Sequence, residues 1–97
     1  MQNLEVTLYT DAERLKSFLR QNQLVQANAI AQRLEGVFQD MLKEGEMSES
    51  NRFWPMFKAA LRVRSHILAG RREEGEKEAV LIQTLINQTR GERTCQP

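Results

Sequence analysis

NRFWPMFKAALRVRSHILAGRR, residues 51–72, is the stretch that decides the fold of this chain. It contains the only Trp, three of the six aromatic residues and six of the fourteen Lys/Arg residues, and it has no Asp or Glu. Its apolar residues recur at helical spacing, which predicts a helix ending near Ala69 with the core stripe Phe53, Met56, Ala60, Val63 and Ile67. Pro55 suits the first turn of such a helix, where a missing amide hydrogen costs little. One face of this helix is apolar and another is basic.

Helical spacing also occurs on both sides of this segment. It predicts a helix from Thr10, where TDAE forms a capping box, to about Gln21. A second helix is predicted to include residues 27–41, with apolar side chains from Ala27 to Met41 directed toward the core. A last helix is predicted to follow Gly75 and to end at Gly91. The sequence therefore predicts a mainly α fold, a small bundle of about four helices in two helical hairpins. The whole chain, residues 1–97, is expected to form a single domain.

The two ends of the chain are predicted to lie outside the helices. Leu4, Val6 and Leu8 alternate with polar or aromatic neighbours, so residues 4–9 are expected to form a short strand or extended segment, and residues 1–9 an extended arm. Such an arm pairs with another chain, pairs with a copy of itself, or packs on the helices. Residues 92–97 are predicted to be a disordered tail. The polar run 71–78 is expected to be a turn or a frayed connection between the last two helices.

Composition restricts the class of protein. The net charge is +1, so no overall field attracts the chain to nucleic acid or to a membrane. The beginning of the chain does not resemble a secretory signal and no apolar run approaches a membrane span, so a cytoplasmic location is expected. The single cysteine, Cys95, excludes a disulfide within the chain and a zinc cluster.

No arrangement of residues predicts catalysis. His66 is the only histidine, and helical spacing brings Arg62 and Arg64 near it rather than a carboxylate that could orient it. The five glycines are dispersed, so no phosphate-binding loop is predicted. We therefore expect no enzymatic activity, no cofactor and no metal site.

The candidate binding surface lies on the helix within 51–72. Lys58, Arg62 and His66 follow one another at one-turn spacing, which is compatible with a solvated face, an acidic protein partner or nucleic acid. The cluster FWPMF (53–57) is expected to serve the core, an interface or both. The predicted partner-binding residues are Phe53, Trp54, Phe57, Lys58, Arg62, Arg64, His66, Arg71 and Arg72.

These features favour a non-enzymatic modulator or adaptor that binds a larger protein with an acidic patch. A phage- or plasmid-encoded inhibitor or modifier of a host enzyme that acts on nucleic acid is one such protein. A cytoplasmic export chaperone is an alternative, because two helical hairpins resemble, in architecture alone, the flagellar and type III secretion chaperones. A small nucleic-acid-binding regulator is the other alternative. A homodimer is also compatible with the wide apolar face of the helix.

Overall fold

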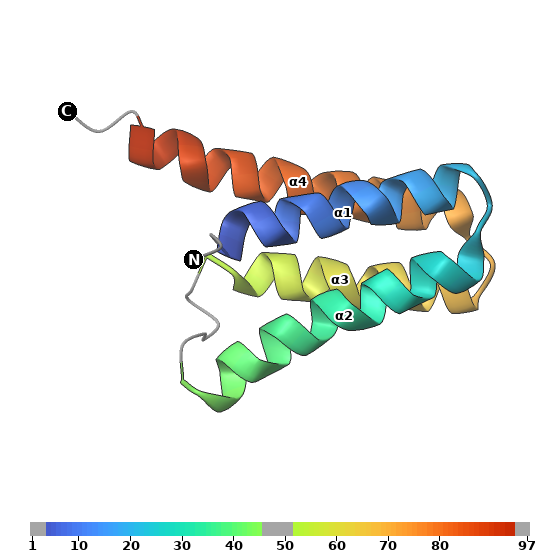
Figure 1. Ribbon diagram of the computed structural model, residues 1–97, viewed down its shortest axis with the longest axis horizontal. Helices are drawn as coiled ribbons and strands as arrows, with labels where there is room; N and C mark the ends of the chain where they lie inside the picture. The colour runs from blue at the N-terminus through green and yellow to red at the C-terminus, as the bar shows by residue number, and fades with distance from the viewer. Residues whose placement is uncertain (1–3, 46–51, 95–97) are drawn as a thin grey trace.

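Four helices form an antiparallel bundle in which the first and last helices are neighbours (Figure 1). They are α1 (Leu4–Arg20), α2 (Leu24–Lys43), α3 (Trp54–Leu68) and α4 (Arg72–Thr94). The computed structural model describes residues 4–45 and 52–94, and the side chains of α4 as far as Gln88. This part of the chain contains helices and no strand, which confirms the predicted mainly α four-helix bundle. Each helix packs on the next one along the chain, and α1 packs on α4 to close the ring.

The core lies on the axis of the bundle and follows the predicted helical spacing. The largest side chains without solvent exposure come from all four helices: Phe38, Leu8, Leu15, Leu19, Leu34, Met56, Ile82, Ile86 and Val63. Burial of one such side chain stabilises the fold by about 1.5–3 kcal/mol. Phe38 of α2 and Phe57 of α3 contact each other with their ring centroids 6.0 Å apart. The predicted stripe of α3 is entirely buried, and Pro55 lies in the first turn of that helix as expected.

The prediction of an extended segment at residues 4–9 is wrong, because α1 begins at Leu4. The Thr10 capping box is wrong for the same reason, since Thr10 lies inside the helix. The inward face of α1 begins with Glu5, which is 4% exposed, and continues through Leu8, Ala12, Leu15 and Leu19. Because Glu5 occupies a core position, the helical spacing of apolar residues is hard to recognise at the beginning of α1. The Glu5 Oε1 atom forms an ion pair with Arg52 Nη2 at 3.4 Å.

Two predictions about α4 are also corrected. The polar run 71–78 is not a turn, because α4 begins at Arg72 and Gly75 is buried within it. A Cβ atom at Gly75 would lie 3.5 Å from Leu19 Cδ1, so a small residue fits this helix contact. The helix passes through Gly91 to Thr94, so residues 92–94 are helical rather than part of a tail. Residues 95–97, including Cys95, lie outside the described residues.

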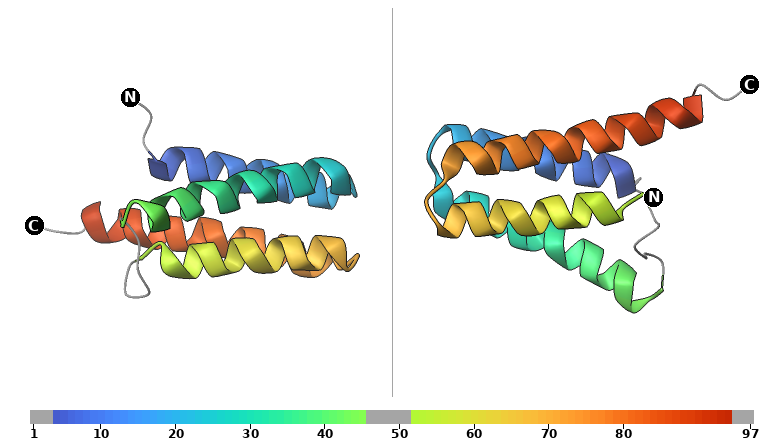
Figure 2. Two further views of the ribbon diagram at one scale, coloured as in Figure 1. Left: turned by 90° about the horizontal axis from the view of Figure 1, so that it is seen from below. Right: turned by 180° about the vertical axis from the view of Figure 1, so that it is seen from behind.

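The connections between helices use left-handed backbone conformations. Asn22, with φ of 59°, reverses the chain between α1 and α2. Gly70, with φ of 77°, follows α3, and the Arg71 amide donates to the His66 carbonyl at 2.8 Å. This bond satisfies a carbonyl group at the end of the helix. In Figure 2, the beginnings of α1 and α3 and the ends of α2 and α4 lie at the same end of the bundle.

Gly36 is an interior helical glycine that no other helix approaches closely among the described residues. It lies inside α2, and apart from its chain neighbours and the nearby backbone of its own helix, no described atom would come within 4 Å of an added Cβ. Gly36→Ala is therefore expected to raise the free energy of unfolding by about 0.5–1 kcal/mol, because alanine loses less backbone entropy in a helix. Urea denaturation followed by circular dichroism measures this change. Gly45→Ala is the matched control, and it should destabilise the protein because Gly45 has a φ of 74°. An unchanged or lowered stability of Gly36→Ala would contradict the prediction.

Candidate binding surface on α3 and α4

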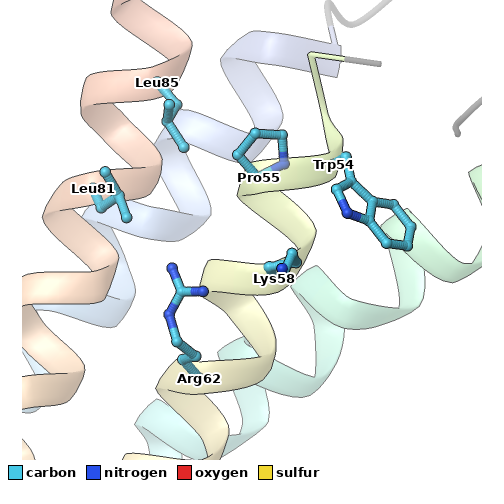
Figure 3. A pocket seen from close by; sticks show the side chains of 6 residues that line it. All are labelled: Trp54, Pro55, Lys58, Arg62, Leu81 and Leu85. Atoms are coloured by element: carbon cyan, nitrogen blue, oxygen red, sulfur yellow. The ribbon is translucent and has the colours of Figure 1, made fainter. Parts of the chain in front are cut away.

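An open groove of about 340 Å³ lies between α3 and α4 (Figure 3). Its lining residues are Trp54, Pro55, Lys58, Arg62, Leu81 and Leu85. Four of these six side chains are apolar, and the two polar ones are cationic. Figure 3 shows Pro55 pointing toward α4 near Leu85, and Arg62 extending toward α4 below Leu81. The groove therefore combines an apolar lining with positive charge from α3.

The two cations of the groove differ in whether they are neutralised. The Arg62 guanidinium forms an ion pair with the Glu78 carboxylate, which crosses from α3 to α4. Lys58 is exposed, and among the side chains of residues 4–45 and 52–88 its ammonium group has neither a hydrogen-bond nor an ion-pair partner. Lys58 is thus the cation that an incoming group can engage without breaking an internal pair.

The aromatic cluster 53–57 belongs mainly to the core. Phe53 and Phe57 are buried, and the Arg52 guanidinium carbon lies 4.9 Å from the centre of the Phe53 ring. Trp54 is half-buried and contacts Phe57 edge to face at 5.8 Å. Its indole points away from α4 toward α2 in Figure 3. Of the three predicted aromatic residues, Trp54 alone is well placed to contact a partner directly.

A second apolar feature follows the solvent face of α3. Leu61 is 41% exposed and Leu68 is 72% exposed. Together with Trp54 they recur every seven residues, so they lie along one side of the helix. Lys58 comes one turn after Trp54 and lies between this stripe and the groove. The wide apolar face predicted for this helix therefore extends beyond what the core covers.

The remaining predicted cations lie elsewhere. Arg64 Nη1 donates to the buried Glu35 carboxylate of α2 at 3.0 Å. Arg71 Nε donates to His66 Nδ1 at 2.9 Å, and Arg72 Nη1 donates to the Arg20 carbonyl at 3.5 Å. The structure thus separates the predicted set into three locations: the groove, the α2–α3 contact and the turn between α3 and α4.

Sequence reasoning missed the side of the groove that α4 provides. Leu81 and Leu85 are half-buried and one helical turn apart, beside the buried stripe of Ala79, Ile82 and Ile86. Apolar residues on both sides of a core stripe were the signal that could have identified this surface.

Titratable groups on the other side of the bundle have a structural role. Gln83 of α4 is buried and donates to Glu13 Oε2 of α1 at 2.6 Å, while Lys16 Nζ lies 3.0 Å from the same carboxylate. The hydrogen bond from Gln83, and then that from Lys16, lowers the pKa of Glu13 below its ordinary value. The ionised carboxylate therefore supports the α1–α4 contact above its unfolded pKa. That support is lost as the pH falls through the lowered value.

No group of three or more His, Cys, Asp or Glu side chains that could hold a metal ion occurs among the described residues. In the part of the chain that the structure describes, no helix is both long enough and apolar enough to cross a membrane. Comparisons with protein-family models, with curated proteins and with solved structures find no match for this chain.

Proposed function

We propose that this protein is a non-enzymatic modulator or adaptor that binds a larger protein through α3 and the adjoining side of α4. The observation that carries the proposal is an apolar surface with an unneutralised cation in it. Leu81 and Leu85 are half-buried and line the groove with Lys58, and Leu61 and Leu68 are exposed further along α3. Apolar side chains surrounded by polar ones are typical of protein interfaces, whose centres they occupy.

The charges of α3 favour a protein partner over nucleic acid. A nucleic-acid-binding helix needs several cations that contact phosphates. Arg62 and Arg64 are instead engaged by Glu78 and Glu35. An acidic protein segment needs only one free cation beside an apolar surface, which is what Lys58 and its neighbours offer.

Photocrosslinking from the surface of α3 tests this proposal. The photoreactive residue benzoylphenylalanine would replace Leu61 in one variant and the exposed Ser17 of α1 in a matched control. Both variants would be irradiated in nuclease-treated lysate of the source cell or its host. We expect a discrete adduct with one larger protein from position 61 and none from position 17. The activity of that protein, once purified, should change when the wild-type chain is added.

Three outcomes would argue against the proposal. Equal adducts from both positions would indicate nonspecific contact. A captured exported protein whose activity the chain does not change would favour the export chaperone. Adducts that require intact nucleic acid would favour the nucleic-acid-binding regulator.

A further inference from the structure

We infer that the segment bound on this surface is an acidic amphipathic helix of the partner, lying along α3 with a carboxylate against Lys58. This inference rests on the proposed function and specifies the chemistry of the partner segment. Amphipathic helices commonly bind by placing their apolar face in a groove. The spacing of the lining residues, the charge of α3 and the length of its exposed stripe each support this occupant.

The spacing of the lining residues fits a helix that runs along the groove. Lys58 and Arg62 are four residues apart on α3, and Leu81 and Leu85 are four residues apart on α4. Both sides therefore repeat about every 6 Å, at a rise of about 1.5 Å per residue. A helix laid parallel to α3 presents its own side chains at i and i+4 with the same repeat. All lining residues come from two neighbouring helices, so the partner can approach from the solvent side.

The charge of α3 defines the chemistry of the partner helix. Between Trp54 and Leu68 the chain has three Lys/Arg residues and no acidic residue. The ion pair of Arg62 with Glu78 occupies one end of the groove. Lys58 lies between that end and Trp54, and no described side chain pairs with it. A carboxylate on the partner helix complements Lys58. A second copy that docks through its own α3 would oppose cation to cation, so an isologous dimer on this face is disfavoured.

The exposed stripe sets a minimum length for the partner helix. Trp54, Leu61 and Leu68 span fourteen residue steps, which is about 21 Å of helix. A partner helix of about four turns covers this distance. Apolar residues repeating every seven positions would then match the stripe, with acidic residues on the flank that faces Lys58.

Peptide selection against two matched baits tests the inference. The probe is an mRNA-display library of 16-residue peptides with fixed helix-forming positions and randomised remaining positions. The baits are the wild-type chain and Lys58→Glu, both shown to be folded by circular dichroism. We expect peptides from the wild type to carry apolar residues at one-turn spacing with Asp or Glu on one flank. Peptides from Lys58→Glu should carry Lys or Arg on that same flank.

A selected acidic peptide then gives a quantitative measurement. Its affinity for Lys58→Glu should be about tenfold lower than for the wild type, and its affinity for Leu61→Asp should be lower still. Arg14→Glu is the matched control, because Arg14 is exposed on α1, which packs on α2 and α4. That substitution should leave the affinity unchanged.

Two results would overturn the inference. One is a consensus without acidic residues, or the same consensus from both baits. The other is a concentration-dependent dimer of the wild-type chain in analytical ultracentrifugation that Leu61→Asp abolishes, because a second copy would then occupy the surface. Neither result decides whether a larger protein crosslinks at Leu61, so the proposed function can survive the failure of this inference.

Discussion

Phe38→Ala is expected to lower the free energy of unfolding by about 3–5 kcal/mol, the largest effect of any substitution considered for this protein. The Phe38 ring has no solvent exposure and contacts Phe57 across the α2–α3 contact. Truncation removes this buried apolar area and leaves a cavity that the backbone cannot close fully. Small domains are stable by only about 5–15 kcal/mol in total, so the variant should unfold at much lower denaturant concentration. Urea denaturation monitored by circular dichroism measures the shift.

Phe38→Leu is the matched control for this prediction. Leucine retains much of the apolar volume, so its cost should be clearly smaller than that of alanine. A second comparison is Phe18→Ala, since Phe18 is only partly buried against the core. A loss of less than 1 kcal/mol for Phe38→Ala would show that α2 and α3 do not depend on this contact.

Arg64→Ala is expected to have the second largest effect, a loss of about 1.5–3 kcal/mol. Its guanidinium donates to the buried Glu35 carboxylate at 3.0 Å. Truncating Arg64 leaves that charge buried without its partner, and the cost is moderated because the Arg64 side chain itself reaches solvent. Thermal and urea unfolding would measure the loss. Binding of the selected acidic peptide should be unchanged in the folded variant, because this arginine is engaged inside the bundle.

The double variant Arg64→Met/Glu35→Leu separates charge from packing. Removing both partners eliminates the uncompensated charge, so we expect it to be more stable than Arg64→Ala alone. If the double variant is less stable than Arg64→Ala, the ion pair stabilises the fold by more than the desolvation of its two charges costs. If Arg64→Ala instead retains full stability and loses peptide binding, Arg64 belongs to the binding surface after all.

The number and order of the helices could be predicted from the sequence because α2, α3 and α4 each have apolar residues at helical spacing on the inward face. Pro55 and the stripe from Phe53 to Ile67 located α3 to within a few residues. The same reasoning failed for the first turns of α1. Leu4 and Leu8 fit both a strand and a helix, and Glu5 occupies the inward position where helical spacing requires an apolar residue. Its ion pair with Arg52 is a tertiary contact, which helical spacing does not reveal.

The candidate surface could be predicted only in part. The sequence drew attention to Trp54, Lys58 and Arg62, which line the groove. It could not show that Arg62 and Arg64 are neutralised, because Glu78 and Glu35 lie 16 and 29 residues away on other helices. Nor could it show that consecutive aromatic residues separate into buried Phe53 and half-buried Trp54. Local spacing indicates which side of a helix a residue occupies, whereas its partners depend on the packing of the bundle.

The closure of the ring by α1 and α4 has a consequence for the order of events during synthesis. Leu8, Leu15 and Leu19 have no solvent exposure in the complete bundle, and Lys16 bonds to Gln83 at a separation of 67 residues. A growing chain on the ribosome can form α1 and α2 early, but the side of α1 that α4 covers stays open until the last helix emerges. The bundle therefore folds completely only after α4 has been synthesised. Until then, the nascent chain exposes a strip of leucines that molecular chaperones could bind.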